Sequence, residues 1–470
     1  MHSWARALFA VTLAGCGAPP APEEAAGRRP NLVLIVADDL GYGHLGCYGQ
    51  EKIRTPNLDR MAAEGLRFVR AYAGSSVCAP SRSALMTGQH TGHTPVRANG
   101  GDRYLHSEDV TMAEVLKPAG YATGLFGKWG LGNRPESPGH PLRQGFDEFF
   151  GQLDQMHAHF HYPYWVWDNF ERRLLPENEG RRAGRYVHDA IHERALDFIR
   201  RRKDRPFFAY LAYTLPHVEL AVPEDSEAPY RGRFPRRAIP DPRPGYRGSE
   251  DAYATFAGMV GRLDRAVGEV LSLLRELGIA DRTFVFFTSD NGAQGGAPWQ
   301  ALVEFFRGTG GLRGSKGQFY EGGLRVPLIA WGPGRVPAGA VTDRTTAFWD
   351  VLPTAADLAG VKPPAGIDGV SFAPVLRGLP GTRPGCLYWE YPFRDGLAQA
   401  ALRGNWKAIR PRPKAPLELY DLGEDPFETT DRAAERPGLA KEFLEIFAAA
   451  RTEERPYPAG VRRAVDDFVR

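Results

Sequence analysis

The chain has 470 residues, of which 43% are hydrophobic and 24% charged, a composition typical of a folded globular protein rather than a disordered or collagen-like one. This length can bury a large core and indicates two or three domains, or one large domain with an appendage. The net charge of +3 produces no strong field, which argues against nucleic acid as a partner, and four cysteines are too few for a disulfide scaffold.

An apolar run at residues 7–14 is too short to span a bilayer, which takes about 20 residues, and fits the centre of an export signal. It ends in Leu13-Ala14-Gly15-Cys16, which resembles a bacterial lipobox, where cleavage leaves a lipid-bearing cysteine. An ordinary signal peptide with an incidental cysteine is the alternative. We therefore expect a lipoprotein signal peptide at 1–15, lipidation of Cys16, a tether at 16–29, and a membrane-anchored protein of the periplasm or cell surface.

Strand and helix candidates alternate along the next 300 residues. Residues 31–37 are continuously apolar, as in a buried parallel strand, and Thr55 and Gly65 are expected to bound a helix. Further strands are predicted at 66–71, 121–126, 206–212, 283–287 and 326–331, and the apolar spacing over 260–274 predicts a helix. This alternation favours an α/β fold with a mostly parallel sheet.

Polar residues follow several of these strands, at the sheet edge where ligands of α/β proteins bind. They are Asp38, Asp39, Lys128, His217, Asp290 and Asn291. Solvated turn charges would explain any one of them, but not readily all of them together. The pattern therefore predicts a functional site at this edge.

Short strand candidates follow residue 375, at 386–390, 402–409 and 417–422, and a helix is expected at 439–450. We therefore expect a catalytic domain at 30–375 and a small C-terminal subdomain with an antiparallel sheet and a helix at 376–470. Residues 223–248, rich in Pro and Arg, are expected to form a surface loop.

The most informative segment reads CAPSRSALMTG, from Cys78 to Gly88. It resembles the C-x-P-S-R signature, with its x-x-L-x-T-G extension, of formylglycine-dependent sulfatases, in which a formylglycine-generating enzyme oxidises the cysteine to an aldehyde. The resemblance spans about Pro30 to Glu435. Further matching pieces are Gly127-Lys128-Trp129, Ser289-Asp290-Asn291-Gly292, Lys316-Gly317, Tyr320-Glu321-Gly322-Gly323 and Leu419-Tyr420-Asp421-Leu422. It implies an alkaline-phosphatase-like α/β fold, a large, mostly parallel sheet flanked by helices, with a smaller C-terminal α+β subdomain.

A divalent cation is expected at the strand ends. Asp38, Asp39, Asp290 and Asn291 offer oxygen ligands, which Ca²⁺ and Mg²⁺ prefer. Carboxylates gathered without a cation would raise one another's pKa values. The resemblance adds the converted Cys78 to the metal ligands and makes Ca²⁺ the first choice, with Mg²⁺ second.

The resemblance also implies a two-step reaction. One hydroxyl of the hydrated aldehyde attacks sulfur, and the second expels sulfate, which a serine with its single hydroxyl could not do. Arg82 lies one helical turn after residue 78 and is expected to hold the hydrated aldehyde. Lys128 and Lys316 supply positive charge to the transferring group. His217, alone or with Lys316, is the candidate general acid.

One position departs from the family pattern. Many sulfatases read G-K-W-H-L-G where this chain has Gly130 in place of the histidine, which in the family contacts formylglycine and is the usual candidate base for expelling sulfate. In an extended segment, His157, His159 and His161 would share one face, so His157 or His159 is a candidate replacement. Aromatic packing in a loop and a transition-metal site are the alternatives.

The leading interpretation is a carbohydrate sulfatase acting on sulfated polysaccharide fragments. Aromatic residues between 160 and 170 would either stack on sugar rings or belong to the core. The second interpretation is a phosphoester or phosphonate-ester hydrolase of the same superfamily. The third, prompted by Gly130, is a non-catalytic binder of sulfated glycan. The remaining cysteines, Cys47 and Cys386, are either free or paired.

Overall fold

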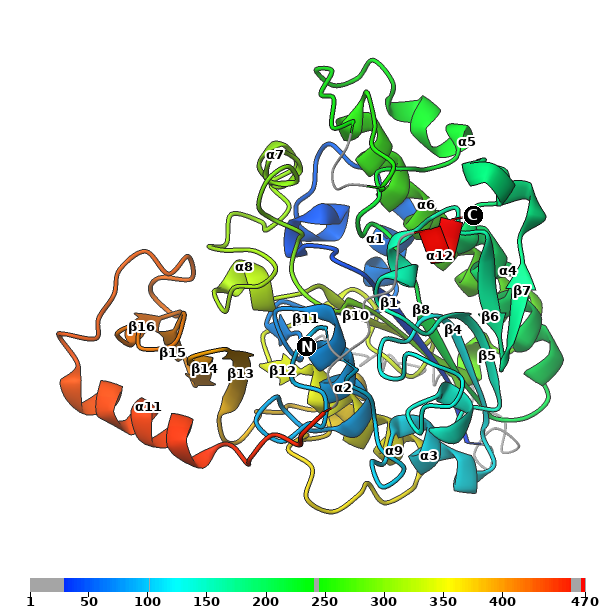
Figure 1. The fold of residues 1–470 in the computed structure, drawn as a ribbon. Helices are drawn as coiled ribbons and strands as arrows, with labels where there is room; N and C mark the ends of the chain where they lie inside the picture. The colour runs from blue at the N-terminus through cyan, green and yellow to red at the C-terminus, as the bar shows by residue number, and fades with distance from the viewer. Residues whose placement is uncertain (1–28, 101, 241–244, 458–465, 470) are drawn as a thin grey trace, which may run out of the picture.

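The computed structural model describes residues 29–100, 102–240, 245–457 and 466–469 (Figure 1). The predicted signal peptide, the lipidation site Cys16 and all but the last residue of the tether lie outside the described residues. None of the helices in the described ranges has the length and apolar character needed to cross a membrane.

A ten-stranded sheet forms the centre of the molecule, in the order β11-β2-β10-β9-β1-β8-β4-β5-β6-β7. Its strands are β1 (Asn31–Ala37), β2 (Leu66–Phe68), β4 (Ala122–Lys128), β5 (Glu148–Gln152), β6 (Trp165–Asp168), β7 (Glu171–Leu174), β8 (Phe207–Ala212), β9 (Thr283–Ser289), β10 (Leu328–Trp331) and β11 (Ala340–Thr342). The central strands β9, β1, β8, β4 and β5 are parallel, which confirms the predicted α/β sheet.

Helices cover both faces of this sheet (Figure 1). One face packs against α1 (Pro56–Ala63), α4 (Val187–Arg202) and α6 (Ala252–Glu276), and the other against α2 (Cys78–Thr87), α3 (Met112–Leu116) and α9 (Val351–Ala359). Within β1, Val33 and Ile35 belong to the first core and Leu32 and Leu34 to the second. Burial on both faces is why β1 is continuously apolar.

The C-terminal subdomain is an antiparallel sheet of β13 (Leu387–Phe393), β14 (Gly396–Arg403), β15 (Trp406–Arg410) and β16 (Glu418–Asp421), with α11 (Pro437–Ala449) packed on it through Phe443 and Phe447. The single strand predicted at 402–409 is wrong. Gly404, with φ 64°, turns the chain there, so the segment is a hairpin. The last described helix, α12 (Asp466–Val469), returns to the main domain, where the carbonyl of Phe468 accepts a hydrogen bond from the Tyr164 amide.

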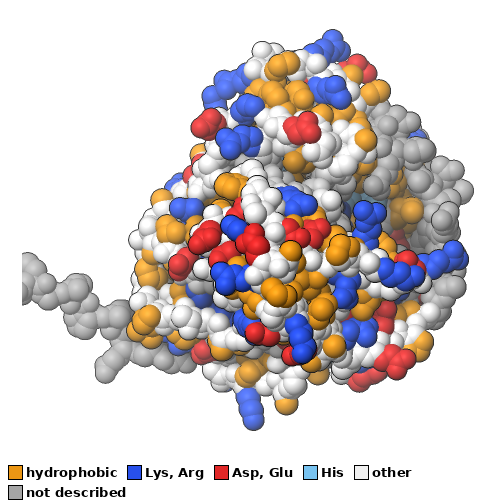
Figure 2. Space-filling model, turned by 90° about the vertical axis from the view of Figure 1, so that its left-hand side faces the viewer, with side chains coloured by type: hydrophobic (Ala, Val, Ile, Leu, Met, Phe, Trp, Pro, Cys, Tyr) orange, Lys and Arg blue, Asp and Glu red, His pale blue; other side chains and the backbone are white. Residues whose placement is uncertain are grey.

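Smaller differences concern strand boundaries and pairing. The strand predicted at 66–71 is divided between β2 and β3 (Ala71–Tyr72), which pairs with β12 (Thr346–Ala347) in a separate sheet. Strand β10 runs antiparallel to β9. The remaining short helices are α5 (Glu224–Glu227), within the expected surface loop, α7 (Gln300–Phe305), α8 (Glu321–Leu324) and α10 (Ala373–Leu376). Figure 2 shows acidic, basic and apolar side chains interspersed on one face of the molecule.

Candidate functional site

Helix α2 places Cys78 at its first position, where the thiol is 2% exposed. Asn99 fixes this first turn, because its side-chain oxygen accepts a hydrogen bond from the Ala79 amide at 2.9 Å. The helix ends at Gly88, whose left-handed conformation (φ 71°) closes the last turn. Arg82 follows Cys78 by one turn, as predicted, and is completely buried.

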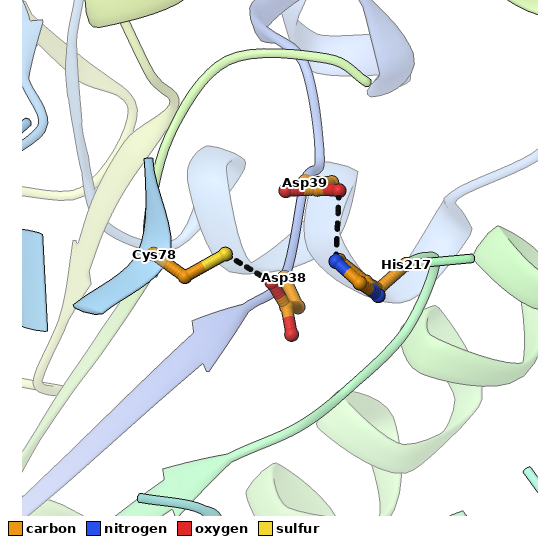
Figure 3. Close-up of side chains that lie close together, drawn as sticks. All are labelled: Asp38, Asp39, Cys78 and His217. Atoms are coloured by element: carbon orange, nitrogen blue, oxygen red, sulfur yellow. Dashed lines mark hydrogen bonds and ion pairs between the residues drawn. The ribbon is translucent and has the colours of Figure 1, made fainter. Parts of the chain in front are cut away.

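Two aspartates follow the end of β1, where Asp38 faces Cys78 and Asp39 faces His217 (Figure 3). Asp38 accepts a hydrogen bond from Lys128 Nζ at 2.7 Å through Oδ2, and its Oδ1 lies 3.7 Å from Cys78 Sγ. Asp39 adopts a left-handed backbone (φ 63°), a conformation that aspartate tolerates better than most residues. The two carboxylates thus meet different cations at one edge of the sheet.

Asp39 binds the second lysine. Lys316 Nζ lies 2.7 Å from both Asp39 oxygens and donates to His217 Nε2 at 3.1 Å. His217 Nε2 is 3.3 Å from Asp39 Oδ2 (Figure 3). The predicted general acid and its lysine therefore form one contact network on this aspartate.

Asp290 and Asn291 enter from the end of β9. Nε and Nη2, on one edge of the Arg82 guanidinium group, both donate to Asp290 Oδ2, at 3.0 and 2.8 Å. Arg82 Nη1 donates to the carbonyl of Lys128. Asn291 Nδ2 donates to Asp39 Oδ1 at 2.8 Å. Arg82 thus positions the carboxylates, while its predicted contact with the hydrated aldehyde stays a prediction.

The buried charges shift one another's pKa values. Burial raises the pKa of Asp290 to about 7, and the negative charge of Asp38 adds to this rise. Burial also opposes ionisation of Asp38, but His217, Lys128 and Arg82 outweigh it and lower its pKa. Burial raises the pKa of the Cys78 thiol to about 12 and lowers that of His217 well below its usual range. Cys78 is therefore a neutral thiol, not an activated thiolate.

These residues fit a hard divalent cation. Ligand atoms of Asp38, Asp39, Cys78 and His217 lie within 4.8 Å of one another. The side-chain oxygen of Asn291 is buried without a hydrogen-bond partner, so it is available as a ligand. A bound cation would also offset the crowding that raises the pKa of Asp290. The oxygens of Asp38, Asp39 and Asn291 are donors that suit Ca²⁺ or Mg²⁺. The predicted ligand Asp290 is not among the residues whose ligand atoms lie within 4.8 Å of one another.

A larger side chain at Gly130 would strain the backbone and displace the end of the Gln155 side chain. Gly130 has a left-handed backbone (φ 75°), and a Cβ there would lie 2.0 Å from Gln155 Nε2. The Gln155 amide therefore fills the space beside Gly130, where the family pattern has histidine. Spacing gave no indication of this, because Gln155 lies 25 residues further along the chain.

The histidine run is not extended, because residues 157–159 form a 3-10 helix, so the condition for three rings on one face is not met. His157 packs between Trp165 and Phe468 and pairs with the Trp165 carbonyl at 2.9 Å. The His159 ring faces His217, with ring centroids 4.6 Å apart, and its Nδ1 lies 2.7 Å from the Tyr246 hydroxyl. His159 alone of the two candidates is thus beside the site.

The neighbouring aromatic residues are mostly core. Phe160, Tyr162, Trp165 and Trp167 are all buried, and the exposed Phe170 stacks on His140. Of the two alternatives, these four rings therefore belong to the core and do not stack on sugar. Cys47 and Cys386, whose pairing the sequence left open, are free thiols.

Sequence reasoning missed three contacts within the site. Asn99 holds the first turn of α2, Gln155 fills the space beside Gly130, and Ser81 Oγ donates to the Asp290 carbonyl. Only Ser81 carried a sequence signal, since it lies within the cysteine motif. The other two follow from loop conformations that no local pattern specifies.

Comparison with known proteins agrees with this geometry. The pattern of the Sulfatase family matches residues 30–361, and that of the N-sulphoglucosamine sulphohydrolase C-terminal region matches residues 315–441. N-acetylgalactosamine-6-sulfatase of Canis lupus familiaris is 35% identical over 440 residues, covering 86% of this chain and 75% of that protein.

Two solved structures share the fold. Ps i-CgsB, in complex with k-i-k-neocarrahexaose, has a TM-score of 0.76 and 27% identity, covering 92% of this chain and 95% of that one. A phosphonate monoester hydrolase of Agrobacterium radiobacter has a TM-score of 0.67 and 23% identity, covering 90% and 95%. The second similarity concerns the fold alone.

Proposed function

The chain belongs to the sulfatase family of sulfuric ester hydrolases, and we propose that it releases sulfate from a sulfated carbohydrate, using formylglycine made from Cys78 and a divalent cation. The observation that carries the proposal is the signature cysteine, buried at the start of α2 beside Asp38 and within the field of Lys128 and Lys316. The carbohydrate substrate is supported by the canine relative, an N-acetylgalactosamine-6-sulfatase, and by Ps i-CgsB, whose structure contains k-i-k-neocarrahexaose.

Each residue of the site has a distinct role in this proposal. Hydrated formylglycine at position 78 would supply two hydroxyls, one to attack sulfur and one to release sulfate. A cation held by Asp38, Asp39, Asp290 and Asn291 would polarise a sulfate oxygen. Arg82 fixes Asp290, while Lys128 and Lys316 compensate negative charge on the transferring group. The pair of Lys316 and His217 protonates the departing alcohol oxygen.

Export and lipid anchoring at Cys16, in the periplasm or at the cell surface, remain part of the proposal, supported by the lipobox-like sequence. A formylglycine-generating enzyme is a further partner. Because Cys78 is 2% exposed in the folded chain, that enzyme would reach it before folding.

The test compares substrates. With an aryl sulfate and the matching aryl phosphate and phosphonate ester, we expect kcat/KM to be at least about 100-fold higher for the sulfate, because differential transition-state binding sets such ratios. The measurement is release of the phenol. A preference for the phosphonate would support the second interpretation. Sulfated-glycan binding without turnover, in protein whose residue 78 carries the aldehyde, would support the third.

Removal of the cation is expected to lower turnover by at least about 100-fold, because a bound metal contributes several kcal/mol of charge stabilisation. Protein treated with a chelator and then dialysed is assayed with Ca²⁺, Mg²⁺ or neither. Ca²⁺ is expected to restore turnover of wild type but not of Asp39→Asn at the same concentration. Full activity of metal-free protein would contradict this.

Replacing His217 by alanine is expected to lower turnover by about 10²–10⁴-fold for alkyl sulfates, which need protonation of the leaving oxygen, and by less for nitrophenyl sulfate. His159→Ala is expected to cost about 10-fold, since it acts through the His217 ring. His157→Phe, which keeps the ring packing on Phe468, is the matched control. Equal losses of turnover for alkyl sulfates and nitrophenyl sulfate would contradict the assignment of His217 as the general acid.

A further inference from the structure

A second group of metal-ligating side chains lies at the far end of α2. His90, His93 and Asp368 bring ligand atoms within 4.8 Å of one another. His93 Nδ1 lies 3.0 Å and His90 Nε2 3.5 Å from the same oxygen, Asp368 Oδ1. Helix α2 has ten residues and is therefore about 15 Å long, so this cluster is remote from Cys78.

We propose that His90, His93 and Asp368 bind a divalent transition metal, distinct from the cation at Asp38 and Asp39. Two imidazoles and one carboxylate form a donor set suited to Zn²⁺ and its neighbours rather than to Ca²⁺. A tetrahedral ion with bonds of about 2.0–2.2 Å separates its ligand atoms by about 3.3–3.6 Å. The His90 separation of 3.5 Å lies within this range, and the His93 separation of 3.0 Å would lengthen slightly on coordination.

The cluster is held in place by backbone contacts. Gly88 O accepts hydrogen bonds from the amides of Asp368 and Gly369, and the His90 amide donates to Asp368 Oδ2 at 3.0 Å. A Cβ at Gly92 would lie 2.1 Å from the Ala450 carbonyl, so only glycine allows this loop to approach the C-terminal subdomain so closely. The donor atoms are therefore gathered before any metal arrives.

The buried His90 ring is a neutral imidazole and can therefore bind a metal. Burial lowers the pKa of His90 to about 4, and its ring is packed edge-on against Tyr388 and stacked on His93. Arg383, the nearby cation, is engaged by Asp350. The His93 and Asp368 side chains are 29% and 19% exposed, which gives an ion access and leaves room for a water ligand.

Metal coordination would break one hydrogen bond of the His90 ring. In the metal-free chain, His90 Nδ1 accepts a 3.2 Å hydrogen bond from the Gly92 amide. Binding a metal through Nε2 moves the ring proton to Nδ1 and breaks that bond. Metal uptake therefore releases no net proton from neutral His90.

The site would join three parts of the fold. His90 and His93 follow α2, Asp368 lies between α9 and α10, and Tyr388 on β13 packs against His90. Next to them, Thr91 Oγ1 accepts from the Glu390 amide of the C-terminal sheet at 2.7 Å. A metal here would brace the loop that follows α2 against the segment between α9 and α10, beside the contact with the C-terminal sheet, so its role is structural.

The experiment uses the full chain with Ca²⁺ in excess, so that the oxygen-rich site stays filled, and adds Zn²⁺. Calorimetry is expected to show one Zn²⁺ per chain, with affinity at least about 100-fold weaker in His93→Ala and in Asp368→Asn. Zn²⁺ is also expected to raise the melting temperature of wild type and not that of His93→Ala. Anomalous scattering at the zinc edge would locate the ion.

His106→Ala is the matched control, because His106 is a half-exposed histidine that pairs with Glu108 outside the cluster. It is expected to bind Zn²⁺ as wild type does. Absence of Zn²⁺ uptake at millimolar concentration, or equal uptake by a folded His93→Ala, would overturn the proposal. Asp368→Asn has nearly the same shape as wild type, so weaker Zn²⁺ binding by this variant cannot be attributed to misfolding.

Discussion

Replacing Cys78 by alanine is expected to abolish sulfate release, lowering turnover by about 10⁴-fold or more, as loss of a covalent nucleophile does in other hydrolases. The physical reason is local. Cys78 is buried within the field of Lys128 and Lys316, and its thiol has a pKa raised to about 12 by burial. The unmodified thiol is therefore a poor nucleophile, and activity depends on its conversion.

A serine at this position makes a sharper test than alanine. Cys78→Ser offers one hydroxyl, so it is expected to accept sulfate once and stop, leaving a sulfated peptide detectable by mass. Cys386→Ala, a change at a free thiol in the C-terminal subdomain, is the control and should retain wild-type turnover. Wild-type protein active with an unmodified thiol at residue 78 would refute the mechanism.

Replacing Lys407 by methionine is expected to destabilise the chain by about 3–5 kcal/mol, because it leaves buried carboxylates without their cation. Lys407 Nζ lies 2.8 Å from Glu321 and 2.9 Å from Glu428, and all three side chains are buried. Arg325 also pairs with Glu321, so the four charges balance. The substitution removes one of the two positive charges from the buried contact between α8 of the main domain and β15 of the C-terminal subdomain.

The loss should depend on pH in a defined direction. Burial opposes ionisation of Glu321, but Arg325 and Lys407 outweigh it and lower its pKa to about 2. A depressed carboxyl pKa contributes stability that is present above about pH 4.5 and lost as pH falls toward 2. The difference between variant and wild type should therefore be largest near pH 7 and shrink in acid.

Urea unfolding at several pH values measures this difference. Arg403→Ala, which removes an exposed ion pair with Glu442, is the control and should cost less than about 1 kcal/mol. A Lys407→Met variant as stable as wild type at pH 7 would contradict this prediction. It would mean that water or a structural rearrangement stabilises the negative charges of Glu321 and Glu428.

The parallel sheet and the strand-end residues followed from local patterns. Residues 31–37 are apolar throughout because both faces of β1 are buried, and parallel strands then bring Asp38, Asp39 and Asp290 to one edge. Local patterns predicted the hairpins and the strand boundaries less well. The turn at Gly404-Asn405 is a local hairpin signal that the single predicted strand overlooked, whereas the antiparallel entry of β10 depends on tertiary packing.

The sequence by itself determined the signature cysteine, the oxygen donors and the two lysines, because these residue types stand in fixed spacing within motifs or directly after strands. Only the tertiary structure decided which partners they meet. Arg82 binds Asp290, Lys316 joins Asp39 to His217, Gln155 fills the space beside Gly130, and His159 rather than His157 faces the site. These contacts join residues 25 to 277 positions apart, and such pairings are set by packing of the whole core.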